Sequence, residues 1–342
     1  MRKARNTNMI GRLKATANRL GYHVISRRTA DEILERHPWL EEQLGGQSDR
    51  PAAATPVAGP DSPRLTELRR RYAGHRATAH TVWATENVAR DLDITNFRGD
   101  NVYVWQTRST NPIQYLLSTY YVRDNDPLGL FEKMHEDGAF GAHTYEHNGR
   151  AISRDMLDSI LEITFLDEQI GLATRPDLTV LDIGAGYGRL AYRMAETLPN
   201  LARYFCVDAV AESTVVSELY IRHRGVEDKV TVVPLDEAER VITTNRIDVA
   251  VNIHSFSECA LSSIEFWLDL IDRAAIPWIF VVPNTGSRLI SSESDGSRLD
   301  ALPTFKAHGY TLALTRDKYH RSPDVQKFGL FPSTYFLFKR DK

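Results

Sequence analysis

Residues Val180–Leu190 read VLDIGAGYGRL, and they are the strongest single indication of how this chain folds. A short apolar run leads directly into Gly184, Gly186 and Gly188, and a helical pattern follows. Glycine suits such a turn because it lacks a Cβ, so the chain can turn tightly and a ligand can approach the backbone. The pattern predicts a ligand-binding turn at a strand end, with Asp182 placed to meet a cationic amino group.

The glycine spacing separates two classes of cofactor. Dinucleotide-binding turns have the spacing G-x-G-x-x-G, which would need a glycine where this chain has Arg189. The spacing found is D-x-G-x-G-x-G instead. A nicotinamide-dependent oxidoreductase is therefore a less favoured alternative.

After Pro176, apolar β-branched runs alternate with helical patterns, as in an α/β domain with a largely parallel sheet. Ligands of such sheets bind outside the carboxyl ends of the strands. The last two strands are separated by a loop without a clear helix, so they could pair antiparallel. The predicted strands are Thr179–Ile183, Tyr204–Asp208, Val230–Val233, Asp248–Asn252, Trp278–Val282, Tyr310–Thr315 and Thr334–Lys339.

The part before this sheet divides at a stretch rich in Gly, Pro and Ala, Gly45–Pro63, which has the composition of a linker. A helix is expected to begin after Ser153 as N-cap and to end at Gly171. The sequence thus predicts an α/β protein with three segments: a helical segment and linker over 1–62, a mainly helical region over 63–175, and a Rossmann-like domain over 176–342.

The overall composition limits the partners and the compartment. The chain has 342 residues, a net charge of -3 and two cysteines, which favours neither polyanion binding nor a disulfide framework or cysteine metal site. No stretch reaches the roughly 18 apolar residues of a membrane span, and the start lacks the apolar run of a secretion signal. We expect a cytoplasmic protein without nucleic-acid or membrane partners. A homo-oligomer stays open.

Polar residues follow the next three predicted strands. Asp208 ends the second strand, where folds of this kind hold ribose hydroxyls by two acceptor oxygens. Asp236 follows the third strand, where it could contact a ligand or act as the N-cap of a helix. The stretch NIHSFSE, Asn252–Glu258, follows the fourth strand, and its Asn and Ser side chains could equally cap the backbone.

Three strings together resemble one family. LDIGAGYGRLAYRM, NIHSFSEC and the upstream EDGAFGAHTYEHNGRAISRDMLDSILEITFL are similar to the sugar O-methyltransferases of bacterial natural-product and glycan clusters, over roughly Val102 to Phe338. The resemblance implies a class I methyltransferase with a seven-stranded sheet and S-adenosyl-L-methionine as cofactor. It also implies a hydroxyl of a sugar-containing small molecule as acceptor, and a lid and acceptor-binding role for residues 63–175.

The resemblance further implies where the cofactor lies. The glycine loop would hold its methionine part, Asp208 its ribose, and Asp236 its adenine amino group. The cofactor-binding residues expected are Asp182, Gly184, Ala185, Gly186, Tyr187, Gly188, Asp208, Ala209, Asp236 and Asn252.

Methyl transfer to a hydroxyl needs alignment of the reacting atoms and a base for the acceptor proton. His254 is the predicted base, because a neutral imidazole accepts a proton, and Glu258 or a neighbour would fix its tautomer. The other interpretation is a structural histidine in a loop. A divalent metal that polarises the acceptor is conceivable, but no metal ligands are indicated.

A sugar acceptor calls for polar and aromatic residues around the cleft. The predicted substrate-binding residues are Gln106, Tyr115, Phe140, Tyr145, His147, Arg154, Asn284 and Tyr319. The string His143–His147 also matches the H-x-x-E-H pattern of zinc peptidases, which requires a helix. Nearby glycines and the Asn148-Gly149 turn disfavour that helix, so a loop is expected.

Other functions remain. An amine or a non-sugar hydroxyl is an alternative acceptor, and an amine needs no strong base. A non-catalytic partner protein that keeps the fold is the alternative from another class, but the glycine loop is intact here.

Overall fold

The computed structural model describes residues 62–78, 96–99, 112–284 and 286–341. The chain divides into two compact units, Met1–Gly46 and Gln47–Lys342, and every residue described here belongs to the second. The predicted regions 63–175 and 176–342 therefore fall within one compact unit. The predicted helical segment and most of the linker in 1–62 lie outside the described residues.

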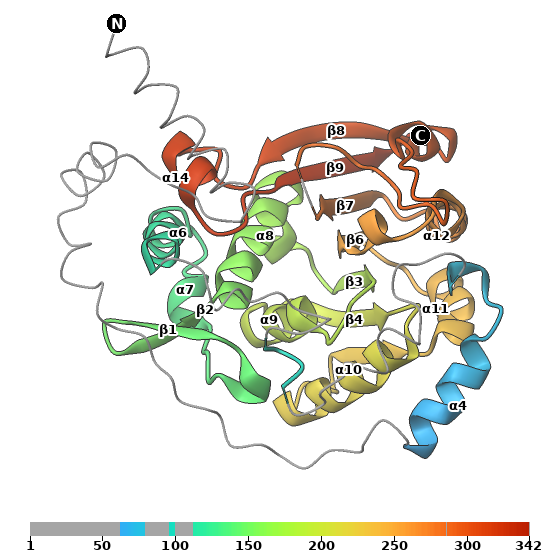
Figure 1. Ribbon diagram of the computed structural model, residues 1–342, viewed down its shortest axis with the longest axis horizontal. Coiled ribbons are helices and arrows are strands. Elements are labelled where there is room, and N and C mark those ends of the chain that lie inside the picture. Colours follow the sequence, from blue (N-terminus) through green and yellow to red (C-terminus); the bar gives the residue numbers. More distant parts are fainter. Residues whose placement is uncertain (1–61, 79–95, 100–111, 285, 342) are drawn as a thin grey trace, which may run out of the picture. The chain divides into compact units, whose positions relative to one another are not determined.

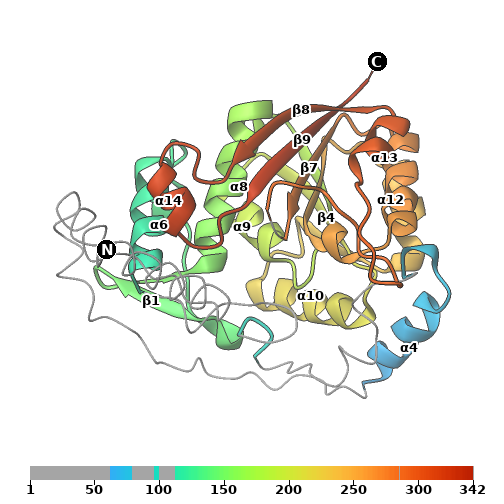
Figure 2. The same cartoon turned by 45° about the horizontal axis from the view of Figure 1, so that its top comes forward.

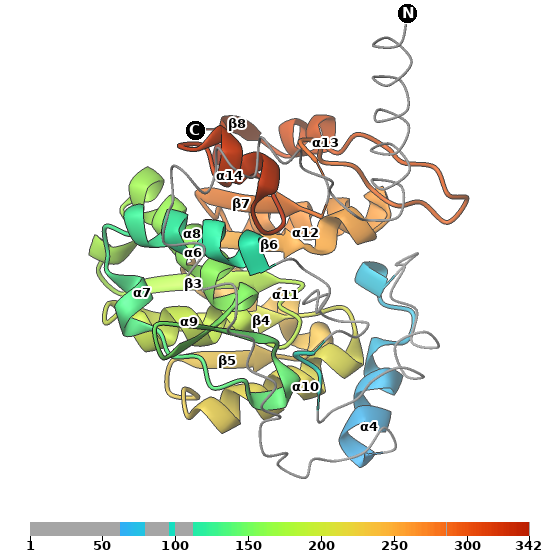
Figure 3. The ribbon, with the colours of Figure 1, turned by 60° about the vertical axis from the view of Figure 1, so that its left-hand side comes forward.

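Within the described part of the chain, seven strands form one sheet in the order β5-β4-β3-β6-β7-β9-β8. Figure 3 shows the run from β5 through β4, β3 and β6 to β7. The first five strands of the order are parallel, and β9 runs antiparallel to both β7 and β8. This confirms the predicted Rossmann-like sheet of class I methyltransferases, including its antiparallel end. The strands are β3 (Leu178–Ile183), β4 (Leu201–Val207), β5 (Val230–Val233), β6 (Val249–His254), β7 (Trp278–Pro283), β8 (Tyr310–Asp317) and β9 (Thr334–Arg340).

The burial of the strands explains why the sequence predicts them as apolar runs. Every residue of β3 is buried, because the central strand of a parallel sheet is covered on both faces. The predicted fourth strand ended at Asn252, whereas β6 continues to His254, since Ile253 and His254 still pair with Val282 and Pro283 of β7. This extension brings His254 to the edge of the sheet where the strands end.

Among the described residues the longest helix is α8, and both of its predicted ends are confirmed. The Ser153 hydroxyl accepts a hydrogen bond from the Met156 N–H at 3.1 Å, and Gly171 ends the helix at a φ of 65°. The α-helices are α4 (Pro63–Tyr72), α6 (Pro112–Asp124), α7 (Leu130–Lys133), α8 (Arg154–Ile170), α9 (Arg189–Thr197), α10 (Ala211–Arg224), α11 (Ala238–Thr244), α12 (Leu261–Arg273), α13 (Leu302–Ala307) and α14 (Pro323–Phe328). Short 3-10 helices are η1 (Arg76–Thr78), η2 (Ala139–Gly141), η3 (Leu172–Thr174), η4 (Leu235–Glu237) and η5 (Ser255–Glu258).

The helices join parts of the chain that are far apart in sequence. α8 packs against α9, α11 against α12, and the early helix α4 against α10 (Figure 1). α14, near the end of the chain, lies beside α6 (Figure 2). The region before the sheet thus packs onto the sheet domain from several sides.

The H-x-x-E-H string lies in a β-hairpin, not in the expected loop. Strand β1 (Thr144–His147) pairs antiparallel with β2 (Arg150–Ser153) across the Asn148-Gly149 turn. In an extended strand, residues four apart are separated by about 13 Å, against about 6 Å on a helix. His143 and His147 therefore do not have the spacing of a zinc-peptidase pair.

Candidate functional site

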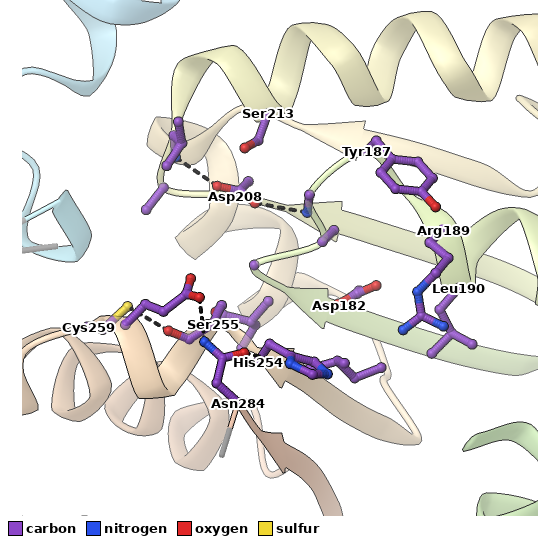
Figure 4. A pocket seen from close by; sticks show the side chains of 18 of the residues that line it. Asp182, Tyr187, Arg189, Leu190, Asp208, Ser213, His254, Ser255, Cys259 and Asn284 are labelled. Atoms are coloured by element: carbon purple, nitrogen blue, oxygen red, sulfur yellow. Dashed lines mark hydrogen bonds between the residues drawn. The ribbon is translucent and has the colours of Figure 1, made fainter. Parts of the chain in front are cut away.

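A cavity of about 480 Å³ lies at the carboxyl ends of β3, β4 and β6, where ligands of α/β sheets bind. Asp208 lies on one side of it, and His254 with Asn284 on the other (Figure 4). Its wall is formed by Arg154, Asp155, Asp158, Asp182, Ile183, Gly184, Ala185, Gly186, Tyr187, Arg189, Leu190, Asp208, Ala209, Val210, Ser213, Ile253, His254, Ser255, Glu258, Cys259, Trp267, Asn284 and Phe331.

The three glycines of the loop have different functions. All have positive φ, but a Cβ on Gly184 would lie 2.1 Å from the Ser255 Oγ, whereas a Cβ on Gly186 would meet no atom within 4 Å. Gly188 does not line the cavity, and a Cβ there would lie 3.1 Å from Ile221 and Ser217 of α10. Gly184 and Gly188 thus permit close packing, while Gly186 leaves room for a ligand at the backbone.

Asp208 is tied to the glycine loop. Its carboxylate accepts the Gly186 N–H at 2.9 Å and the Val210 N–H at 2.8 Å, one on each oxygen. Burial raises its pKa to about 6 despite these bonds. Each oxygen can accept a further hydrogen bond, so the group suits a pair of hydroxyls.

Asp182 lies at the end of β3, buried in the cavity wall. The Tyr204 hydroxyl donates to it at 2.9 Å. Burial raises the pKa of its carboxyl to about 7. A cation placed in the cavity would favour the ionised form, which fits the predicted contact with an amino group.

A hydrogen-bonded chain leads from His254 to Glu258 through Asn284. Figure 4 shows the side chains of His254 and Asn284 next to each other. The Asn284 amide nitrogen donates to the Glu258 carboxylate, so its Oδ1 faces His254 and accepts the Nδ1 proton at 2.5 Å. The Ser257 hydroxyl accepts the Asn284 backbone N–H at 3.2 Å. This arrangement leaves Nε2 of a neutral His254 without a proton, as an acceptor.

His254 is half-buried and has a backbone φ of 72°, unusual for a residue with a side chain. Burial lowers its pKa to about 3, with the charges of Arg154 and Arg189 acting in the same direction and Asp158 opposing them. The imidazole is therefore neutral at physiological pH. A neighbouring side chain fixes the tautomer of His254, as predicted. This side chain is Asn284, which was expected to bind substrate.

Besides Gly188, two more predicted cofactor residues, Asn252 and Asp236, do not line the cavity. The buried Asn252 amide donates to the Ile183 carbonyl at 2.8 Å and accepts the Phe256 N–H at 2.9 Å, so it joins the end of β3 to η5. This is the backbone-capping alternative. Asp236 is not among the residues that line the cavity. Its carboxylate forms an ion pair with Arg71 of α4 at 2.8 Å.

Most of the predicted substrate-binding residues do not line the cavity. Arg154 and Asn284 do, and Gln106 lies outside the described residues. Tyr319 is fully buried, and its hydroxyl donates to Ser118 and to the Leu330 carbonyl. The remaining residues pack in aromatic pairs instead: Tyr115 with Tyr145, Phe140 with Phe97, and His147 with Tyr120.

Several wall residues were not predicted. Asp158 lies four residues after Arg154, so the helical spacing could have indicated that both share one face of α8. Arg189, taken only as a mismatch to another motif, binds Glu162 through two hydrogen bonds of 2.8 and 3.0 Å. Phe331 lies in the loop before β9, where the sequence carries no recognisable signal.

Among the described residues, no group of three or more His, Cys, Asp or Glu side chains could hold a metal ion. No helix in these ranges is long and apolar enough to cross a membrane.

The chain matches no protein-family model and no curated protein sequence. It is similar to the cyclase SpnF at 15% identity, with a TM-score of 0.39 and coverage of 67% of this chain and 96% of that chain. A SAM-dependent methyltransferase from Aquifex aeolicus gives 14% identity, a TM-score of 0.38 and coverage of 65% and 97%. TrmK of M. capricolum, solved with S-adenosyl-homocysteine, gives 13% identity, a TM-score of 0.33 and coverage of 50% and 67%. At these identities the likenesses concern the fold alone.

Proposed function

We propose that this protein is an S-adenosylmethionine-dependent methyltransferase that methylates a hydroxyl of a sugar-containing small molecule. One observation carries the proposal: a single cavity joins the glycine loop and two carboxyls to a histidine whose Nε2 is held as a proton acceptor. The glycine loop and the two carboxyls fit an adenosyl amino acid. The histidine fits an acceptor that must lose a proton.

The residues at the glycine end fit the cofactor. Asp208 would accept the two ribose hydroxyls, and Asp182 would pair with the amino group. The open side of Gly186 gives the ligand access to the backbone. The apolar wall formed by Ala209, Val210 and Trp267 suits a flat purine.

At the other end, His254 takes the acceptor proton. When bound, S-adenosylmethionine would supply a methyl group on a sulfonium. The C–O bond to the acceptor would form as the C–S bond breaks, and the electron pair of the C–S bond would stay on sulfur. The proton of the acceptor hydroxyl moves to Nε2 of His254, and Asn284 Oδ1 holds the opposite N–H of the resulting imidazolium.

The low pKa of His254 is compatible with this step. A pKa of about 3 makes the imidazole a weak base toward a free alcohol, yet it keeps Nε2 unprotonated and ready at any physiological pH. A hydroxyl oxygen that is methylated before it loses its proton becomes an oxonium, which is a far stronger acid than imidazolium. Proton transfer late in the displacement therefore needs only a weak, well-placed acceptor.

A sugar acceptor is supported by the chemistry of the cavity wall near α8. Arg154 and Asp158 offer charged hydrogen-bonding groups, and Phe331 offers an apolar ring face. Sugars are bound by this combination, because polar groups take the hydroxyls and rings pack on the apolar face of the sugar.

The test is incubation with radiolabelled S-adenosylmethionine and a set of glycosides. His254→Ala should lower kcat about 10²–10⁴-fold, while calorimetry shows unchanged affinity for S-adenosylhomocysteine. His308→Ala is the matched control, because His308 pairs with Asp269 away from the cavity wall. Full turnover in His254→Ala would remove His254 as base, and labelling of amines but not of glycosides would contradict the sugar acceptor.

A further inference from the structure

The carboxyl groups of Asp182 and Asp208 line the glycine end of the cavity, and neither forms an ion pair within the described part of the chain. Asp182 is held by the Tyr204 hydroxyl, and Asp208 by the N–H groups of Gly186 and Val210. Asp182 is buried and Asp208 is half-buried. Two acids are thus drawn away from bulk water among neutral donors, which is costly for their ionised forms unless a cation joins them.

The arginines that line the same cavity have carboxylates of their own. Arg189 makes two hydrogen bonds to Glu162, and Arg154 donates to Asp158 at 3.1 Å. The described residues add no other Arg or Lys to the cavity wall. Both arginines therefore pair with acids of α8, and neither forms an ion pair with the two carboxyls at the glycine end.

The pKa values of these two carboxyls agree with this distribution of charge. Burial raises the pKa of Asp182 to about 7, although the hydrogen bond from Tyr204 and the charge of Arg189 lower it. The charge of Asp208 raises it further. Burial likewise raises the pKa of Asp208 to about 6, and the charge of Glu258 adds to the rise. A cation between these acids would stabilise their ionised forms.

The ligand of the proposed function brings a cation to this place. In S-adenosylmethionine the sulfur stands in the middle of the chain of atoms that joins the amino group to the ribose hydroxyls. With the amino group at Asp182 and the ribose at Asp208, the sulfonium lies between the two carboxyls, which Figure 4 shows beside the glycine loop. A sulfonium has no N–H or O–H group, so it gives up few hydrogen bonds to water when it is buried.

We propose that Asp182 and Asp208 select for the positive charge at the sulfur position, so that the site binds S-adenosylmethionine more tightly than S-adenosylhomocysteine. This inference rests on the proposed function and deepens it, because it assigns to these two residues the discrimination between cofactor and spent product. When the methyl group moves to the acceptor oxygen, the electron pair of the C–S bond stays on sulfur and the sulfur becomes neutral. The attraction to both carboxylates is then lost, which favours release of the product.

The experiment compares ligands that differ at the sulfur position. The purified full-length protein is titrated by calorimetry at about pH 8, where both carboxyls are ionised, without any acceptor. S-adenosylmethionine should bind about tenfold or more tightly than S-adenosylhomocysteine, because a unit charge a few ångström from a carboxylate in a poorly hydrated site has at least this effect. Sinefungin, which carries an ammonium group in place of the methylated sulfonium, should also bind more tightly than the product. A smaller ratio, or tighter binding of the product, would overturn the inference.

Variants show whether the two carboxyls cause the preference. Asp182→Asn keeps the size of the side chain, and its amide oxygen can still accept the Tyr204 hydroxyl, but the charge is lost. Both ligands carry the amino group, so the ratio of their affinities reports the sulfur position alone. This ratio should fall at least about threefold in Asp182→Asn and in Asp208→Asn. Asp269→Asn, which removes an acid outside the cavity wall, should leave the ratio unchanged.

The outcomes separate this inference from the proposed function. If the unaltered protein binds neither S-adenosylmethionine nor S-adenosylhomocysteine, the proposed function fails and the inference fails with it. If both ligands bind and the product binds as tightly as the cofactor, only the inference fails. A preference of unchanged size in Asp182→Asn and Asp208→Asn would overturn its assignment to these residues.

Discussion

The Oδ1 atom of Asn284 lies 2.5 Å from Nδ1 of His254. The amide nitrogen of the same side chain donates a hydrogen bond to the Glu258 carboxylate. An amide in this place fixes the tautomer of the imidazole without adding a charge beside it. These contacts give Asn284 a positioning role toward His254.

Asn284→Ala should lower kcat by at least about tenfold, since a base in the wrong tautomer cannot take the proton. The KM for S-adenosylmethionine should stay unchanged, because Asn284 acts on His254 and not on the cofactor. Steady-state kinetics measures both constants. Asn245→Ala, on the sheet domain outside the cavity wall, is the control, and an equal fall in kcat there would point to general damage.

The pH dependence of kcat follows from the low pKa of His254. Because the folded-state pKa is about 3, Nε2 stays unprotonated from about pH 5 to pH 8. At saturating cofactor with a neutral glycoside, kcat should show no acidic limb near pH 6.5, the value for an unperturbed imidazole. A limb with a midpoint near 6.5 would mean that the imidazole is not held in its buried, neutral form.

Cofactor affinity should depend on pH through Asp182. The carboxyl has a pKa of about 7 in the empty cavity, and a cationic amino group binds its ionised form. Affinity for S-adenosylhomocysteine should therefore rise by up to about tenfold per pH unit as the pH increases from about 5 to 7, and level off above. Asp208, with a pKa of about 6, contributes in the lower part of this range.

Calorimetry at several pH values measures this dependence. Asp182→Asn should bind more weakly and should lose the dependence between about pH 6 and 7. An affinity of the unaltered protein that is flat over this range would rule out a salt bridge to Asp182.

Gly184→Ala tests the tight packing of the loop. Its φ is +74°, and the added Cβ would lie 2.1 Å from the Ser255 Oγ. The positive φ costs about 1–2 kcal/mol, and overpacking adds about 1–3 kcal/mol of unfolding free energy. Gly225→Ala is the matched control, with a φ of +65° and no atom within 4 Å. Thermal unfolding should show a larger fall in Tm for Gly184→Ala, and equal shifts would mean that Ser255 does not restrict this position.

The fold was predictable because its signals are local. The buried strand β3, the glycines that follow it and the Ser153 and Gly171 caps each appear within a few residues. Asp208 was also predictable, since strands of a parallel sheet end at one edge and the acid ends the second strand.

The rest of the site depends on contacts between distant segments, which one sequence does not reveal. Asp236 follows the third strand of the sheet as predicted, but its carboxylate forms an ion pair with Arg71 of α4. Phe331 stacks on Arg154 although the two are far apart in the chain. The aromatic residues predicted as sugar contacts were selected by residue type alone. In the structure they are buried and pack against other aromatic rings.

Calorimetry with S-adenosylhomocysteine and with NAD+ on the purified full-length protein is the most direct test of the glycine loop as an adenosyl amino acid site. We predict a heat of binding with S-adenosylhomocysteine, weakened by Asp208→Ala, and none with NAD+. Binding of NAD+ without binding of S-adenosylhomocysteine would contradict the proposed methyltransferase function.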